Sequence, residues 1–409
     1  MRCLFSIEMK RSRFALKFGI QFPSMKQFRI IAIIVFVLGF FKPATTIAQQ
    51  DSCAWRISLL TCTPGEELYS TFGHTAIRVK TDQFDIVFNY GTFEFDDPDF
   101  YSKFVKGKLP YFLSVEQYSD FAYSYLYEKR GIEEQLLLLE CAEKQQLFEA
   151  LKVNAREENK FYKYDFLFDN CTTRAGQIII DNTGNSVSFV NILSAETPSF
   201  RQLLHQYLDK GNQQWSKLGI DILLGSRIDR KVSNREAMFL PDNLKIGLSG
   251  ATSKGKRIAS DPQTIVTSTA IPTEKSLWTP LLLFTILLIV ISAASLVRNA
   301  AVQKSLHIFD RIWFTILGLL GALLVFMWLG TDHGSCKDNW NLIWVLPTHL
   351  IVIFSNWNKP WIRNYYKVIF ILSIITMVSW FLLPQQLNVA LIPIVGLTAF
   401  RSFFIMKSN

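Results

Sequence analysis

The hydrophobic positions of this chain fall into three zones with different patterns. Residues 30–41 form one continuous apolar run, residues 49–250 mix alternating and helical patterns, and long apolar stretches dominate the sequence after Ser276. Alternation predicts half-buried strands and a spacing of three to four residues predicts amphipathic helices, whereas long apolar runs predict membrane spans. We therefore expect a leader, a folded middle domain and a membrane domain.

The first apolar run has the features of a signal peptide. It follows basic residues and is itself followed by Thr46-Ile47-Ala48, whose small residues suit signal peptidase. We predict a signal peptide over 1–48, with Met25 as an alternative start, and an uncleaved anchor as the alternative interpretation. In either case the chain that follows is exported, which in a bacterium with an inner membrane means the periplasm.

The apolar stretches after Ser276 predict a transmembrane domain over 276–409 with five spans. The predicted spans are Leu277–Val297, Ile312–Leu329, Asn341–Phe354, Val368–Leu383 and Asn388–Ile405. If the middle domain is periplasmic, the predicted cytoplasmic loops hold Arg298, Lys304, Arg311, Lys359, Arg363 and Lys367. This distribution agrees with the positive-inside rule. It predicts a multi-pass inner-membrane protein with its N-terminal domain in the periplasm.

Residues 49–250 predict an α+β domain, because strand and helix patterns are segregated rather than alternating. The predicted strands are Trp55–Thr61, Thr75–Val79, Phe84–Tyr90 and Gly131–Leu139, and the predicted helices are Glu143–Glu158 and Asp169–Ile180. The segment 251–275 is rich in Ser, Thr, Lys and Pro, and we predict that it is a linker to the first span.

Composition narrows the function classes further. With 49% hydrophobic residues the chain is not disordered, and six cysteines in 409 residues exclude a disulfide-dense miniprotein. The net charge of +9 lies largely in the leader and at membrane edges, so nucleic acid is not an expected partner. No cysteine or histidine spacing typical of a metal site occurs, and no cofactor is expected.

The cysteines after the leader are odd in number, so an oxidising compartment leaves at least one unpaired. Cys171 is predicted to lie in the first turn of a helix, capped by Asp169 or Asn170. The helix dipole favours a thiolate there, and free backbone N–H groups are available to an oxyanion. His74 begins a predicted strand directly after Gly73, and it would accept the thiol proton if strand and helix pack together.

A third polar group is expected to orient the imidazole of His74. Asn89 is the first choice, because it lies on the following predicted strand, and Asp85 is the second. The alternative is that Cys171 is a small buried hydrophobic residue and that His74 has no chemical role. His205 lies in a helical pattern and is expected to be structural.

Several motifs resemble the Lnb family of bacterial lipoprotein N-acyltransferases. Those that resemble its N-terminal periplasmic domain are Gly73-His74-Thr75, Phe88–Phe93, Asp169–Arg174, Leu224–Asp229 and Met238–Asp242. The segment from Thr331 to Pro347 resembles its membrane domain. The order of a histidine strand before a cysteine helix is also similar to circularly permuted papain-like folds, which is the fold we expect for the periplasmic domain.

The resemblance implies that Cys171 takes an acyl chain from a membrane phospholipid as a thioester, with His74 as general base. The chain would then pass to the α-amine of a lipoprotein N-terminal cysteine. The expected partners are therefore a phospholipid donor, a lipoprotein acceptor and the membrane. The polar loop Thr331–Asn341, which follows the second predicted span and is expected on the outer side of the membrane, is called the outer loop. Together with the family motifs it gives candidates for substrate or lipid docking, which are Arg174, Asp229, His333, Asn339 and Asn341.

Two functions from other classes remain compatible with the sequence. A papain-like peptidase or amidase of the cell envelope would use the same cysteine and histidine, and the membrane domain argues against it. A non-catalytic envelope scaffold would keep the fold and the spans while Cys171 served only in packing. The outer loop also has an alternative interpretation without a functional role, in which it is a capped helix end with interfacial tryptophans.

Overall fold

The computed structural model describes residues 54–94, 96–183, 187–270, 276–355, 357 and 359–407. The predicted signal peptide over 1–48 and its alternative start at Met25 lie outside the described residues, as does Cys53. Among the described cysteines, Cys141 is disulfide-bonded. The thiols of Cys62, Cys171 and Cys336 are free.

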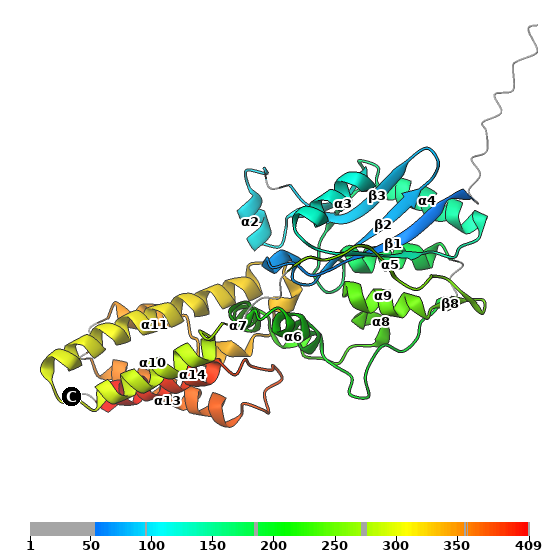
Figure 1. The fold of residues 1–409 in the computed structure, drawn as a ribbon. Coiled ribbons are helices and arrows are strands. Elements are labelled where there is room, and N and C mark those ends of the chain that lie inside the picture. Colours follow the sequence, from blue (N-terminus) through cyan, green and yellow to red (C-terminus); the bar gives the residue numbers. More distant parts are fainter. Residues whose placement is uncertain are drawn as a thin grey trace, which may run out of the picture. The chain divides into compact units, whose positions relative to one another are not determined.

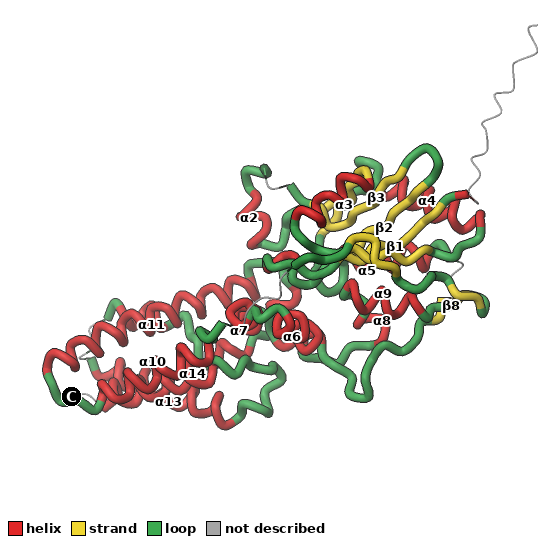
Figure 2. Tube along the Cα trace, in the orientation of Figure 1, coloured by secondary structure: helices red, strands yellow, loops and turns green. Residues whose placement is uncertain are grey.

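A seven-stranded antiparallel sheet organises the N-terminal part of the chain, with the strand order β10-β5-β1-β2-β3-β4-β6 (Figures 1 and 2). The strands are β1 Arg56–Cys62, β2 His74–Lys80, β3 Asp85–Thr92, β4 Pro110–Gln117, β5 Ile132–Leu136, β6 Phe161–Lys163 and β10 Gln263–Val266. The strands predicted from alternation, β1, β2, β3 and β5, are present within a few residues of their predicted bounds.

The prediction of a linker over 251–275 is wrong for much of that segment. It contains β8 (Thr252–Ser253) and β9 (Lys256–Arg257), which form a small sheet with β7 (Val187–Ser188). It also contains β10, which pairs with β5 at the edge of the large sheet. Because an edge strand leaves much of its surface in water, β10 needs no apolar alternation and resembles a polar linker in sequence.

Helices cover both faces of the large sheet. The helices α4 (Cys141–Asn154), α5 (Cys171–Asp181) and α9 (Pro241–Ser249) contribute side chains to the core on one face, and α3 (Tyr118–Tyr127) contributes to the core on the other. The alternation of β1 explains this, because Ile57 and Leu59 enter the first core while Leu60 enters the second. The domain is therefore α+β, as predicted.

A third core joins shorter elements beside the sheet domain. Its helices are α6 (Phe200–Lys210), α7 (Gln214–Leu223), η3 (Ser226–Ile228) and α8 (Asn234–Ala237). Two further short elements, η2 (Leu68–Ser70) and α2 (Phe100–Val105), lie in the connections between strands. Phe200 and Phe239 both belong to this third core, and their tilted rings lie 5.5 Å apart between centroids.

The C-terminal part of the chain is helical, and no described residue in it belongs to a strand (Figure 2). Its elements are α10 (Pro280–Ser295), α11 (Ala300–Leu329), η4 (Gly334–Cys336), η5 (Trp340–Ile343), α12 (His349–Ile353), α13 (Pro360–Val378) and α14 (Leu391–Lys407). Of the described helices, α11 and α13 are long and apolar enough to cross a membrane. A buried ion pair between Asp310 and Arg401 ties α11 to α14.

Two predictions about this part require correction. The predicted span Asn341–Phe354 is not one helix but η5, an irregular segment and the five-residue α12. Pro347 lies in the irregular segment and lacks the N–H that a continuous helix would need. In addition, Lys304 and Arg311 lie on α11 and not in a loop, because α11 begins at Ala300, well before its apolar stretch. Similarly, Arg363 and Lys367 lie on α13.

Candidate active site

Cys171 is the first residue of α5, and Asn170 caps that helix. The Oδ1 atom of Asn170 accepts hydrogen bonds from the N–H groups of Thr172 and Thr173, both at 2.8 Å. The Thr173 hydroxyl in turn accepts the N–H of Asn170 at 2.8 Å, which completes a reciprocal cap. The sequence left Asp169 and Asn170 open as the cap of this helix, and in the structure the cap is Asn170. The N–H of Cys171 has no acceptor among the described residues.

A glycine turn places His74 at the start of β2. Gly73 has a φ of +78°, and a Cβ atom there would lie 2.7 Å from the carbonyl oxygen of Cys62. Only glycine fits this turn without a shift of the backbone. The turn brings His74 directly opposite Cys62 on the neighbouring strand β1. Its imidazole therefore lies at the end of the sheet where α5 begins.

The imidazole of His74 is oriented by Asn89, on the adjacent strand β3. The Nε2 atom of His74 lies 2.6 Å from the Oδ1 atom of Asn89. The amide nitrogen of Asn89 donates to Glu116 at 3.0 Å, which fixes the amide so that its oxygen faces the ring. Asp85, the second choice, instead pairs with Arg78 at 2.6 Å. Asn89, not Asp85, is therefore the residue that the fold brings to His74.

The start of α5 packs directly against β2. The hydroxyls of Thr75 and Thr172 are hydrogen-bonded at 3.0 Å and buried. This contact brings the Cys171 thiol within hydrogen-bonding reach of the His74 imidazole. Because Nε2 is bonded to Asn89, Nδ1 is the ring nitrogen that is left to interact with the thiol. The expected proton transfer depended on packing between the helix of Cys171 and the strand of His74, and in the structure α5 does pack against β2.

The surroundings of Cys171 lower its pKa although the thiol is buried. Burial alone raises the pKa, but the charge and hydrogen bond of His74, the N–H of Thr75 and the hydroxyl of Thr172 outweigh it, and the pKa falls to about 7. For His74, burial opposes the imidazolium, but Cys171 and Asn89 favour it and the net pKa is raised. The pair is therefore poised to form a thiolate and an imidazolium near neutral pH.

The other free thiols differ from Cys171 in this respect. Burial raises the pKa of Cys62 to about 12 and that of Cys336 to about 11. A hydrogen bond with Tyr125 and the charge of Arg130 lower the pKa of Cys62, but by less than burial raises it. Of the three free thiols, Cys171 alone is activated as a nucleophile.

A cavity of about 450 Å³ opens over His74 and Asn89. Gly91, Thr92 and Phe93 at the end of β3 line one part of it. The rest of the wall is Tyr69, Ser70, Gly73, Glu116, Phe121, Ser124, Tyr125, Glu128 and Arg130. The wall of this cavity therefore combines aromatic rings with charged and other polar side chains.

A buried tyrosine hydroxyl close to Cys171 lacks a hydrogen-bond partner among the described residues. It belongs to Tyr162, on β6. A Cβ atom on Gly91 would lie 3.9 Å from this hydroxyl and 3.6 Å from the Cβ atom of Cys171. The absence of a side chain at Gly91 therefore leaves space between the thiol and the hydroxyl. A buried hydroxyl without a partner is costly in a folded protein and calls for an explanation.

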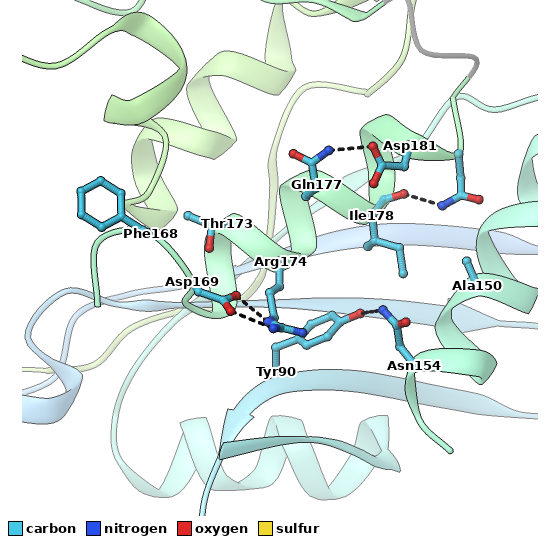
Figure 3. A pocket seen from close by; sticks show the side chains of 11 residues that line it. Tyr90, Ala150, Asn154, Phe168, Asp169, Thr173, Arg174, Gln177, Ile178 and Asp181 are labelled. Carbon is cyan, nitrogen blue, oxygen red and sulfur yellow. Dashed lines mark hydrogen bonds and ion pairs between the residues drawn. The ribbon is translucent and has the colours of Figure 1, made fainter. Parts of the chain in front are cut away.

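Arg174, a docking candidate from the sequence, is engaged within the fold (Figure 3). Its guanidinium makes two hydrogen bonds to Asp169, at 2.6 and 2.8 Å, and lies 3.5 Å from the ring centre of Tyr162. It borders a second cavity of about 480 Å³, which Tyr90 and Asn154 also line, and there the side-chain amide of Asn154 donates a hydrogen bond to the Tyr90 hydroxyl at 2.9 Å. Arg174 thus holds the Tyr162 ring in place.

Asp229, another docking candidate, belongs to a buried ionic cluster. Arg201 bonds Asp229 at 2.8 Å and also Asp221 at 2.8 Å. The Nε2 atom of His205 lies 2.8 Å from Asp221, in keeping with the structural role predicted for this histidine. Asn388, from the C-terminal helical part, donates to the same aspartate at 2.8 Å. The cluster therefore joins the two parts of the chain.

The three docking candidates of the outer loop lie at this junction as well. The side chain of Asn339 donates to the carbonyl oxygen of Ile222 at 2.7 Å, and that of Asn341 donates to the same oxygen at 3.3 Å. The Nε2 atom of His333 lies 3.1 Å from the carbonyl oxygen of Phe104. The structure thus brings Cys171, His74 and Asn89 together but places these docking candidates in contacts between the two parts of the chain.

Tyr162 and Gly91 are the site residues that sequence reasoning missed. Tyr162 lies on a strand of only three residues, too short to show alternation. Gly91, with a φ of +93°, offered a better signal, because a glycine inside a strand pattern marks a bulge or a close approach. The register between β3 and β4 does shift at this position, between Tyr90 and Thr92.

Comparison with protein families gives two matches. Residues 42–206 match the Lnb N-terminal periplasmic domain, and residues 272–408 match the Lnb transmembrane domain. No curated protein and no solved structure matches the chain. The first match contains Cys171, His74 and Asn89. The second covers the helices from α10 to α14.

Proposed function

Because the chain belongs to the Lnb family, we propose that this membrane enzyme of lipoprotein maturation is a cysteine-dependent lipoprotein N-acyltransferase. The observation that carries the proposal is the contact of Cys171 with His74, with the ring of His74 held by Asn89. The match to a periplasmic domain followed by a transmembrane domain supports the proposal, because both proposed substrates are anchored in the membrane. We also assign the periplasmic domain to the permuted papain-like folds, because its histidine strand precedes its cysteine helix.

In the first half of the reaction, the Cys171 thiolate attacks the carbonyl carbon of a phospholipid acyl ester. His74 has taken the thiol proton, and it returns a proton to the leaving glycerol oxygen as the C–O bond breaks. The products are a lysophospholipid and a thioester on Cys171. A nucleophile with a pKa near 7 suits this step, because it is ionised at neutral pH yet remains a good nucleophile.

In the second half, the α-amine of a lipoprotein N-terminal cysteine attacks the thioester carbonyl. The Nδ1 atom of His74 accepts a proton from the amine, the C–S bond breaks, and the Cys171 thiolate leaves. The acyl chain ends as an amide. A thioester is well suited to this exchange, since a thiolate is a better leaving group than the alkoxide of an ester.

Both halves pass through an oxyanion on the acyl carbonyl. We assign its stabilisation to the N–H of Cys171 and the hydroxyl of Tyr162, because each is a donor without an acceptor among the described residues. The space left by Gly91 lies between the thiol and that hydroxyl, where the carbonyl has to sit. Burial raises the pKa of Tyr162, so the phenol keeps its proton and remains a donor.

The junction residues have a positioning role in this proposal. Asn339 and Asn341 hold the catalytic domain against the outer ends of the membrane helices. Asp229 holds Arg201 in the buried cluster that Asn388 also contacts. The enzyme is then a multi-pass inner-membrane protein whose active site faces the periplasmic leaflet. A catalytic domain that is held at the periplasmic surface of the membrane meets substrates that never leave the bilayer.

Detection of the acyl-enzyme tests the proposal. Purified full-length protein is incubated with phospholipid vesicles, digested and analysed by mass spectrometry for an acyl group on the Cys171 peptide. We expect an adduct that neutral hydroxylamine removes and that Cys171→Ala lacks. An unmodified Cys171 peptide from active protein would reject the thioester mechanism. Cleavage of cell-wall peptides by the same protein would instead support a papain-like peptidase.

A further inference from the structure

A row of stacked aromatic rings leads away from the catalytic cavity. Phe93 lines the cavity together with His74 and stacks on Phe100 at a centroid distance of 5.9 Å. Phe100 stacks on Phe104 at 6.0 Å, with the two rings only 12° from parallel. We call these three phenylalanines the aromatic track. It runs from the wall of the active site onto α2.

The far end of the aromatic track touches the membrane domain. The N–H of Asp332 donates to the carbonyl oxygen of Lys106, just after α2, at 2.9 Å. The His333 ring approaches so closely that a Cβ on Gly107 would lie 3.2 Å from it. Asp332 comes three residues after the last residue of α11. Since three residues of chain span at most about 11 Å, α2 meets the membrane domain within roughly that distance of the end of α11.

The surface of α2 is unusually apolar for a helix in water. None of its six residues is buried, and the exposed fractions of Tyr101, Phe104 and Val105 are 81%, 49% and 42%. Aromatic side chains gather at the interface between membrane and water, where their rings meet the acyl chains and their polar atoms stay hydrated. An exposed apolar surface beside the end of a membrane helix is therefore explained by contact with lipid.

We propose that α2 inserts into the periplasmic leaflet and that the aromatic track guides one acyl chain of the donor phospholipid to Cys171. This inference rests on the proposed function and adds the route by which the donor reaches the nucleophile. The donor is favoured as occupant because the track ends at the cavity wall over His74, where the chain to be transferred has to be held. Because Lys106, just after α2, is hydrogen-bonded to Asp332 of the membrane domain, the outer end of the aromatic track stays at the bilayer surface.

The test compares two acyl donors with full-length protein reconstituted in vesicles. One donor is a phosphatidylethanolamine with an isotope-labelled chain, and the other is the water-soluble ester p-nitrophenyl acetate. The variants are Tyr101→Asp and Phe104→Asp, with Phe104→Leu as the conservative change. The matched control is Tyr127→Asp, because Tyr127 is 79% exposed but lies on α3 and lines no part of the cavity.

We expect both aspartate variants to form the acyl-enzyme from phospholipid about tenfold more slowly, because a charge opposes insertion into the leaflet. Their reaction with p-nitrophenyl acetate should stay within about twofold of wild type, as should both reactions of Tyr127→Asp. Phe104→Leu should retain the phospholipid reaction, since it keeps the apolar surface.

Equal losses with both donors, or no loss with phospholipid, would overturn the inference and leave the proposed function intact. Normal acyl-enzyme formation with slower transfer to a lipoprotein would also overturn it, because the track would then serve the acceptor. If wild-type protein reacts with the soluble ester but never with phospholipid, the proposed donor itself is wrong. These results separate failure of the route from failure of the function.

Discussion

The Nε2 atom of His74 lies 2.6 Å from the Oδ1 atom of Asn89. This contact selects the ring nitrogen that faces Cys171 and keeps the imidazole from rotating. We predict that Asn89→Ala lowers the rate of acyl transfer by about 100-fold, within the range of general acid–base contributions. The measurement is the rate of acyl-enzyme formation. Asp85→Asn is the matched control and should remain within about twofold of wild type.

The depressed pKa of Cys171 predicts the pH dependence of its alkylation. The thiolate fraction rises with pH through a midpoint near 7, and the pKa of His74 is raised as well, because the favourable contacts with Cys171 and Asn89 outweigh burial. The rate of modification by iodoacetamide should follow this curve. In His74→Ala the stabilising charge and hydrogen bond are lost while burial remains, so the midpoint should move above the ordinary value of 9.0.

Cys62 provides the internal comparison in the same experiment. Its pKa of about 12 keeps it protonated, so it should remain unmodified while Cys171 reacts. Peptide mass spectrometry distinguishes the two sites. A wild-type midpoint near 9, or equal labelling of both cysteines, would contradict the assignment of Cys171 as the activated thiol.

Removal of the Tyr162 hydroxyl tests the oxyanion assignment. We predict that Tyr162→Phe lowers kcat by about 100-fold, the loss typical of one oxyanion donor, with little change in KM. Because the hydroxyl has no partner among the described residues, its removal should not destabilise the fold. Thermal unfolding provides that second readout. An unchanged kcat would show that the hydroxyl does not serve the carbonyl.

The buried cluster at the junction should dominate stability. In Asp221→Asn, Arg201 and His205 lose their shared carboxylate, and we expect the free energy of unfolding to fall by about 3 to 5 kcal/mol. Asp209→Asn is the control, since that half-exposed carboxylate is bonded by Lys217 and Gln214 near the surface, and its replacement should cost less than about 1 kcal/mol. Unfolding midpoints in detergent measure both. Equal midpoints would mean that the cluster does not hold the junction.

The parts of the fold that were predictable are those with a local signal. The alternation of β1 and β2 and the capped start of α5 can be read from neighbouring residues, and they place Cys171 and His74. Alternation alone does not separate Asn89 from Asp85, because both residues lie on the same face of β3. What separates them is Arg78, which holds Asp85.

The parts that were missed depend on contacts between distant residues. The sequence of β10 resembles a linker, and only its pairing with β5 identifies it as an edge strand. Tyr162 can be assigned to the site only because the fold brings it close to Gly91 and Cys171. Similarly, the polar loop around Asn339 and Asn341 resembled a docking surface because polar side chains in a sequence do not reveal which backbone carbonyls they meet. No local pattern encodes such partners.

The central claim is that Cys171 transfers an acyl chain to lipoproteins. The most direct measurement is mass spectrometry of lipoprotein N-terminal peptides from cells that lack this protein and any other N-acyltransferase, complemented with wild type, Cys171→Ala or Cys62→Ala. We predict that wild type and Cys62→Ala restore the amide-linked chain and that Cys171→Ala does not. Restoration by Cys171→Ala, or no amide-linked chain with wild type, would contradict the claim.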